Sequence, residues 1–244
     1  MSYILYEGPS MIDGKPIVAV MTGVTNPSRN VKTGAMAQVY FLRSDIPPTD
    51  AVKTQEDQSI CGNCPHRGST CYVNVGYGPG AVYQAYKAGS FHPVNPTKAG
   101  YNRVIRLGAY GDPCSVPTDI LTRLLSHAQA WTGYTHSPLL RPELKSYMQA
   151  SADTAEEAVL YQNLGWKTFR VKLPEDPLLS GEIMCPNTRT GIQCAQCQLC
   201  DGKQMNIAIN VHGILPKTTK YRAWRLAKAM VNVGLDIGET ASRC

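Results

Sequence analysis

Several features of membrane-bound and secreted proteins are missing from the sequence. It contains no run of eighteen or more apolar residues, which is about the length that a transmembrane helix requires. Its first fifteen residues lack a basic start followed by an apolar core and a small-residue cleavage site, so no secretory signal is expected. We therefore predict a cytoplasmic protein that has no membrane partner.

Internal repeats, low-complexity tracts and long Pro- or Gly-rich linkers are missing as well. The 244 residues are 43% hydrophobic and 17% charged, as in globular proteins, and they are enough to enclose a substantial core. We predict a single domain over residues 1–244, with an N-terminal β segment at 1–45 and the main fold at 46–244. Nothing in the sequence specifies an oligomeric state.

The charge of the chain has a small positive excess. Lysine and arginine outnumber aspartate and glutamate by 24 to 18, and the excess is spread along the chain rather than gathered in a block. A positive balance favours an anionic partner, either a phosphate-bearing small molecule or nucleic acid. Ordinary solubilising charge explains the same balance, so these interpretations stay open.

Strand-like and helix-like patterns alternate from about residue 80 onward, which is typical of βα units and a parallel sheet. Two earlier β-type runs, at 16–23 and 35–43, flank a turn-rich segment and indicate a hairpin or a cap on one end of the fold. The predicted later strands are 103–110, 131–136, 146–153, 167–173 and 205–213, and the predicted longer helices are 115–129, 154–165 and 218–234.

A single domain with this many parallel strands most readily forms a curved, closed sheet. We predict an α/β fold, specifically a full or partial (β/α) TIM-like barrel with an N-terminal β-rich extension and cysteine-rich βα loops. An open doubly wound sheet is the alternative. In a barrel, every second residue of a strand points inward. A cationic side chain there, such as that of Arg170 or Lys172, requires an anion or a carboxylate as its partner.

Functional residues of such a barrel gather where its strands end. Asp112 and His136 follow predicted strands and are our candidate catalytic residues, with His136 also able to act as a metal ligand. His212 has a similar position, and a structural role is as consistent with it as a functional one. Asp153 precedes the capping pattern that begins at Thr154, so we interpret it as part of a helix start.

Four cysteines fall close together in the loop at 185–200, CPNTRTGIQCAQCQLC. Because cytosolic thiols are kept reduced, metal ligation is the first interpretation for the nine cysteines of this chain. Two separated C-x2-C pairs are usual for zinc, whereas three sulfurs at successive intervals of three residues are typical of four-iron clusters. The spacing predicts one [4Fe-4S] cluster, with zinc as the alternative, on Cys185, Cys194, Cys197 and Cys200.

The first cysteine loop along the chain, CGNCPHRGSTC at 61–71, contains only three sulfurs: Cys61, Cys64 and Cys71. We predict a second metal site here, with Cys114 as a candidate fourth ligand or with one coordination position left open to a substrate, a cofactor, His66 or His136. Half of a zinc site and ordinary buried thiols are the alternatives. The two loops could also share one metal.

Taken together, Cys64-Pro65, Gly111-Asp112, Ser151 to Asp153 and the C-x2-C-x2-C run behind Cys185-Pro186 resemble a phage-encoded family of cysteine-rich, radical-SAM-like (β/α)-barrel proteins. The resemblance covers roughly residues 60 to 212. It implies a four-iron cluster in a barrel and a bacteriophage origin, hence a host cytoplasm, without a settled reaction. Radical-SAM enzymes carry C-x3-C-x2-C, whereas this chain has C-x2-C-x6-C, so S-adenosylmethionine (SAM) as a cofactor is in doubt.

The function we predict is redox or radical-type chemistry at an iron–sulfur cluster, on a small or nucleotide-like substrate. A radical-SAM-like or other iron–sulfur redox enzyme fits this prediction, and a protein whose cluster is purely structural or carries electrons is a further variant, so enzymatic activity stays open. A zinc-stabilised module that binds nucleic acid or a host protein without catalysis is the alternative from another functional class.

Overall fold

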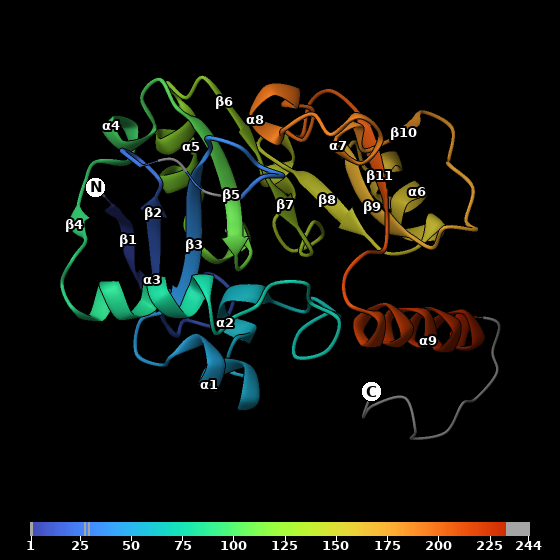
Figure 1. Cartoon of the computed structure of the whole chain (residues 1–244), viewed down its shortest axis with the longest axis horizontal. Coiled ribbons are helices and arrows are strands. Elements are labelled where there is room, and N and C mark those ends of the chain that lie inside the picture. Colours follow the sequence, from blue (N-terminus) through green and yellow to red (C-terminus); the bar gives the residue numbers. More distant parts are fainter. Residues whose placement is uncertain (1, 27, 29, 233–244) are drawn as a thin grey trace.

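The fold is built on two β-sheets that lie side by side in the computed structural model, which describes residues 2–26, 28 and 30–232 (Figure 1). The first sheet has six strands in the order β4-β1-β2-β3-β5-β6. Strands β1, β2 and β3 pair antiparallel, β4 adds in parallel to β1, and on the other side β5 adds in parallel to β3 and β6 in parallel to β5. These strands are β1 (Tyr3–Pro9), β2 (Pro16–Thr22), β3 (Ala37–Arg43), β4 (His92–Pro93), β5 (Val104–Tyr110) and β6 (Ala130–Thr132).

The second sheet has five strands in the order β10-β11-β9-β8-β7, and all of its pairs are parallel. Parallel strands place their carboxyl ends at the same edge, so the loops that follow them meet there. The strands are β7 (Tyr134–Thr135), β8 (Gln149–Ala152), β9 (Thr168–Lys172), β10 (Glu182–Met184) and β11 (Asn206–Asn210).

Helices cover these sheets and fill most of the connections. Within the predicted helix at 115–129, α5 buries one apolar stripe that consists of Ile120, Leu121, Leu124 and Leu125. Thr154 caps α6 by accepting a hydrogen bond from the Glu157 N–H, as its capping pattern predicts. The helices are α1 (Pro48–Lys53), α2 (Gln58–Cys61), α3 (Gly78–Lys87), α4 (Pro96–Gly100), α5 (Thr118–Leu125), α6 (Ala155–Asn163), α7 (Pro186–Thr190), α8 (Cys194–Cys197) and α9 (Leu215–Asn232), with 3₁₀ turns η1 (Pro113–Ser115) and η2 (Pro142–Ser146).

A single residue, Gly133, separates β6 of the first sheet from β7 of the second. Its N–H donates to the Cys200 carbonyl at 3.0 Å and its carbonyl accepts from the Gln149 N–H at 3.0 Å, so both of its polar groups bond on the side of the second sheet. A mixed α/β fold with parallel-rich sheets is thus confirmed. Within the part of the chain that the structure describes, neither sheet closes on itself, and a TIM-like barrel is not shown.

A buried ion pair joins β9 to β10 inside the second sheet. The side chain of Arg170 is 1% exposed and that of Glu182 is 0% exposed, and they form two hydrogen bonds of 2.8 and 2.7 Å. The expectation that a buried Arg170 requires a carboxylate is met by Glu182, which also accepts from the Leu179 N–H at 2.9 Å. Lys172, also buried, instead donates to three backbone carbonyls.

Replacing Arg170 with Met should lower the free energy of unfolding by about 3–5 kcal/mol, because the Glu182 carboxylate would stay buried without its cation. The double variant Arg170→Met/Glu182→Leu should recover most of this loss. Urea denaturation of both, with the exposed Arg189→Met as control, measures the effect. A single variant as stable as the control would contradict it.

Candidate functional site

Both cysteine loops line one cavity of about 420 Å³ at the carboxyl ends of the parallel strands. Its wall also includes apolar side chains, among them Phe169, Val171 and Ile209, and polar groups from the ends of β5, β7 and β11. The expectation that the two loops open on the same face of the fold agrees with this arrangement. The cysteines on the wall are Cys61, Cys64, Cys71, Cys185, Cys194, Cys197 and Cys200.

The second cysteine loop, at 185–200, is fixed through its backbone to the second sheet and to the segment between β2 and β3. Cys185 directly follows β10, and its N–H donates to the Ala208 carbonyl of β11 at 2.8 Å. Cys194 and Cys197 are the first and last residues of α8, and the Cys194 N–H donates to the Lys32 carbonyl at 3.0 Å. Segments far apart in the sequence thus hold these thiols on the cavity wall.

Burial disfavours the charged form of two of these thiols, Cys194 and Cys200. It raises the pKa of Cys194, and it raises the pKa of Cys200 to about 12 against the opposing effect of a hydrogen bond from Tyr134. The neighbouring thiols raise both values further because like charges repel. A thiolate is disfavoured here without a cation, so these groups are poorly suited to act as free nucleophiles and well suited to a metal that supplies positive charge.

The first cysteine loop follows α2, whose last residue is Cys61. Burial raises the pKa of Cys61, Cys64 and Cys71, as it does in the other loop. The neighbouring Tyr110 hydroxyl is buried and has no hydrogen-bond partner among the described residues. An unpaired donor beside three thiols is a group that a bound ligand can satisfy.

The sulfurs form no disulfide, and the eight cysteines among the described residues are free thiols. No three of their sulfurs lie within 4.8 Å of one another. Cys114, the candidate fourth ligand of the first loop, is fully buried in the main core, where its thiol faces Asp112, Thr135 and Ser137 instead of lining the cavity. Cys244 lies outside the described residues.

Asp112, a predicted catalytic residue, is buried at the cavity wall and accepts three hydrogen bonds. The donors are the Cys114 N–H at 2.9 Å, the Thr135 hydroxyl at 3.1 Å and the His136 N–H at 2.8 Å. These bonds fasten the end of β5 to the end of β7. The carboxylate therefore positions His136, while its catalytic role stays a prediction.

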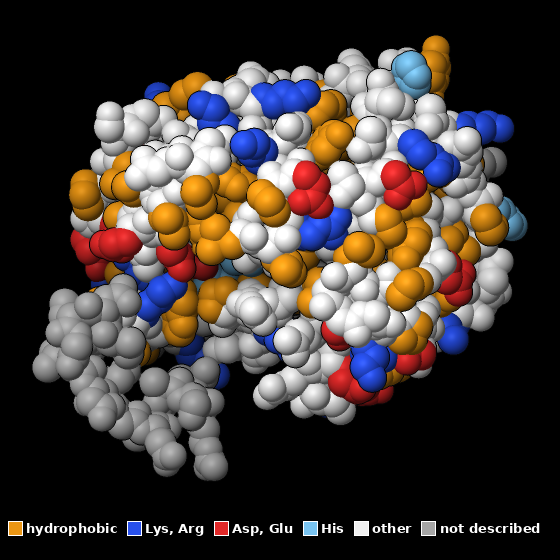
Figure 2. Space-filling model, turned by 180° about the vertical axis from the view of Figure 1, so that it is seen from behind, with side chains coloured by type: hydrophobic (Ala, Val, Ile, Leu, Met, Phe, Trp, Pro, Cys, Tyr) orange, Lys and Arg blue, Asp and Glu red, His pale blue; other side chains and the backbone are white. Residues whose placement is uncertain are grey.

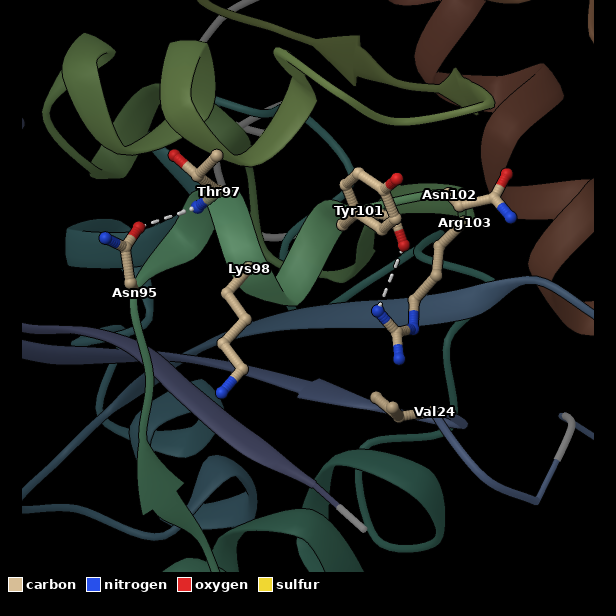
Figure 3. A pocket seen from close by; sticks show the side chains of 7 residues that line it. All are labelled: Val24, Asn95, Thr97, Lys98, Tyr101, Asn102 and Arg103. Carbon is tan, nitrogen blue, oxygen red and sulfur yellow. Dashed lines mark hydrogen bonds between the residues drawn. The ribbon is translucent and has the colours of Figure 1, made fainter.

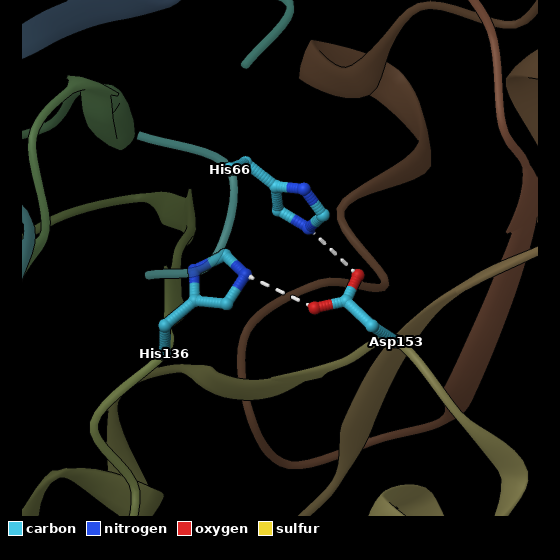
Figure 4. Close-up of side chains that lie close together, drawn as sticks. All are labelled: His66, His136 and Asp153. Carbon is cyan, nitrogen blue, oxygen red and sulfur yellow. Dashed lines mark hydrogen bonds and ion pairs between the residues drawn. The ribbon is translucent and has the colours of Figure 1, made fainter. Parts of the chain in front are cut away.

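Two histidines and an aspartate meet beside the first cysteine loop (Figure 4). Nε2 of His66 lies 2.9 Å from Asp153 Oδ1, and Nε2 of His136 lies 3.8 Å from Asp153 Oδ2. Burial lowers the pKa of His136 despite the nearby carboxylate. Burial alone would raise the pKa of Asp153, but the hydrogen bond and charge of His66 lower it.

Sequence reasoning missed this grouping, because Asp153 was interpreted as a helix start. The structure does place Asp153 there, with its N–H bonded to the Glu157 carboxylate at 2.8 Å, but its own carboxylate points to the histidines. Positions at the ends of β7 and β8 could have indicated the meeting of His136 and Asp153. No local pattern indicates that the loop after Cys64 brings His66 to them.

Cationic and aromatic groups complete the wall. Arg106 donates to the Tyr72 hydroxyl at 2.9 Å and to Gln38 at 3.4 Å, and neither it nor Lys32 forms an ion pair with a described carboxylate. Both lie close enough to Cys194 to stabilise its charged form. His212 bonds only weakly to the Asn210 carbonyl, at 3.2 Å, and its ring lies 6.0 Å from that of Tyr72.

A second hollow lies near α4 and contains no cysteine, histidine or carboxylate (Figure 3). Asn95 caps α4 there, and Arg103 donates to the Tyr101 carbonyl at 3.2 Å. Asn95 and Arg103 are thus engaged in local structure. The cysteine-lined cavity is therefore the better candidate for chemistry.

Comparison with known proteins found no matching family model, no matching curated protein and no matching solved structure. Among the helices that the structure describes, none combines the length and the apolar character needed to span a bilayer. The function must be argued from the cavity itself.

Replacing Asp112 with Asn should lower the free energy of unfolding by about 1–3 kcal/mol, because an amide cannot accept all three of the donors that the carboxylate accepts. Asp119→Asn, an exposed change on α5, is the control. Chemical denaturation of the two variants gives the comparison. Equal stability would show that the Asp112 hydrogen bonds do not hold the two strand ends together.

Proposed function

We propose that this chain is an iron–sulfur protein that holds a [4Fe-4S] cluster on Cys185, Cys194, Cys197 and Cys200. The observation that best supports the proposal is the convergence of these four thiols on the wall of one cavity, although Cys185 is nine residues from its nearest partner in the sequence. Their burial and mutual charge repulsion favour a strongly cationic partner.

The separation of the sulfurs favours a cluster over a single zinc ion. Four thiolates at about 2.3 Å from one tetrahedral zinc lie about 3.8 Å from each other. In this chain no three described cysteine sulfurs come within 4.8 Å of one another. A four-iron cluster binds each thiolate at a different iron, which requires the wider arrangement.

We extend the proposal to a second metal site on Cys61, Cys64 and Cys71. Cys114 faces away from the cavity, so the proposal now leaves this site with three thiolates and a position open to a substrate or cofactor. The unpaired Tyr110 hydroxyl beside these thiols supports a ligand at this position. One cluster shared by the two loops is less favoured, because the thiols that influence each other electrostatically all belong to the same loop.

The cavity also supports a reaction rather than storage of a metal. Its volume of about 420 Å³ is within the usual range of about 300–1,000 Å³ for small-molecule sites. Arg106 and Lys32 offer positive charge for the anionic part of a small or nucleotide-like substrate, and His136 offers a proton-transfer group. An iron–sulfur cluster supplies electron transfer when it is bound.

We also propose that the two sheets form part of a barrel. Residues 130–135 pass from β6 to β7, and we propose that the two sheets curve there as a partial barrel of the radical-SAM-like kind. The phage family resemblance and SAM binding also stay proposals, and they rest on the cysteine motifs.

The alternative is a zinc-stabilised module that binds nucleic acid or a host protein without catalysis. Figure 2 shows acidic and basic side chains interspersed over the back of the molecule rather than a continuous basic surface. Nucleic-acid binding requires concentrated positive charge. This face therefore offers no surface suited to nucleic acid.

Protein purified without oxygen should be brown, with about four iron and four sulfide ions per chain from the second loop and more if the first loop also holds a cluster. Cys197→Ser should remove about four iron ions, whereas Cys114→Ser, which alters a thiol outside the cavity, should keep them. Metal analysis distinguishes the outcomes. Colourless protein loaded with zinc would contradict the proposal.

The first loop can be tested separately with Cys61→Ala/Cys64→Ala and with SAM. The double variant should lose iron beyond that of the second loop, and unchanged iron content would remove the second metal site from the proposal. Reduced protein incubated with SAM should release 5′-deoxyadenosine if the radical proposal holds, which chromatography detects. If the unaltered protein forms no more 5′-deoxyadenosine than the double variant does, radical chemistry is contradicted and the redox proposal remains.

A further inference from the structure

The histidine–aspartate group has the geometry of a small metal site. Nε2 of His66, Nε2 of His136 and a carboxylate oxygen of Asp153 lie within 4.8 Å of one another, and Figure 4 shows both rings facing the carboxylate. The three residues come from the loop after α2, the end of β7 and the end of β8. Both histidines line the cavity.

A hydrogen bond between His66 and Asp153 explains the position of only one of the two histidines. The distance of 2.9 Å between His66 and Asp153 Oδ1 is that of a hydrogen bond. His136 faces the second carboxylate oxygen from 3.8 Å, which is too far for a hydrogen bond but leaves room for an ion between nitrogen and oxygen.

The His66 ring and the backbones of His136 and Asp153 are each held by a hydrogen bond, and a partner on the far ring nitrogen is usual for a histidine that binds a metal. The Thr70 hydroxyl lies 2.5 Å from Nδ1 of His66, so it can accept the ring proton when Nε2 binds an ion. Asp112 holds the His136 backbone at 2.8 Å, and Glu157 holds that of Asp153 at the same distance.

Helix α9 packs over the group and restricts its movement. The ring of Tyr221 stacks on His66 at 5.6 Å between centroids, and the ring of Trp224 meets it edge-on at 5.5 Å. The Tyr221 hydroxyl donates to the Val171 carbonyl at 2.9 Å. The rings are thus set in place by packing as well as by hydrogen bonds.

We propose that His66, His136 and Asp153 bind one divalent first-row transition ion, in a site that uses none of the cysteine thiols. Two imidazoles and one carboxylate suit ferrous iron or zinc, and three protein ligands leave positions for water or substrate on the cavity side. The site goes beyond the iron–sulfur proposal, and it stands or fails independently of it.

Manganese(II) is the probe that separates this site from the thiols, because it favours carboxylate and water over sulfur ligands. Anaerobically purified protein, treated with a chelator to remove loosely held ions, is titrated with Mn²⁺ while the electron paramagnetic resonance signal of free Mn²⁺ is followed. We expect one Mn²⁺ to bind per chain. A titration in which all added Mn²⁺ stays free would overturn the proposal.

The variants are chosen so that folding and binding can be told apart. Asp153→Asn keeps a hydrogen-bond acceptor for His66 but loses the charge, and it should weaken Mn²⁺ binding by more than ~100-fold. His127→Ala alters an exposed histidine and should leave binding unchanged. Equal binding by Asp153→Asn and the unaltered protein would place the ion elsewhere and overturn the assignment.

A second measurement needs no variant. Bound Mn²⁺ should broaden the ring proton resonances of His66 and His136 and spare those of His92 and His127, and the reverse pattern would overturn the site. Iron and sulfide are counted in the same samples. Mn²⁺ binding by protein that contains no iron would support this site and contradict the cluster proposal. A full cluster without Mn²⁺ binding would support the cluster proposal and contradict this site.

Discussion

Seven thiols surround one cavity, and the free energy of burying their charge governs the whole site. Burial raises the pKa of five of them, so a set of thiolates is stable there only beside a strong positive charge. Arg106 and Lys32 supply part of that charge near Cys194. Two monovalent cations cannot neutralise the negative charge of four thiolates. We assign the neutralisation of the remaining charge to iron.

The parallel second sheet explains why most of these groups meet. Asp112, His136, Asp153 and Cys185 follow β5, β7, β8 and β10, and parallel pairing carries the ends of β7, β8 and β10 to one edge of the second sheet. The hydrogen bonds of Asp112 join the end of β5, in the first sheet, to the end of β7. The thiols and the His66–His136–Asp153 group then form adjacent parts of one wall. The proposed cluster would supply electron transfer, and the proposed ion at His66, His136 and Asp153 would supply hydrolysis or oxygen binding. One substrate in the cavity would then lie within reach of both centres.

Local patterns predicted much of the fold. The α5 stripe, the cap at Thr154 and most parallel strands were readable, because periodicity and capping are properties of neighbouring residues. Strand β10 was missed because three residues carry no periodic pattern, so the partner of Arg170 could not be named in advance. The division of the strands into two open sheets could not be predicted either, since it depends on how backbone groups pair around Gly133. At the site, cysteine spacing indicated ligands, but the docking of His66 on Asp153 joins residues 87 positions apart and has no local signature.

The central claim is that iron lies among the sulfurs of Cys185, Cys194, Cys197 and Cys200. Anomalous X-ray scattering from crystals grown without oxygen, recorded above and below the iron absorption edge, tests it directly. The account predicts a compact iron peak enclosed by these four sulfurs at the cavity wall. A peak that appears there only at the zinc edge, or no metal peak between the sulfurs, would contradict it.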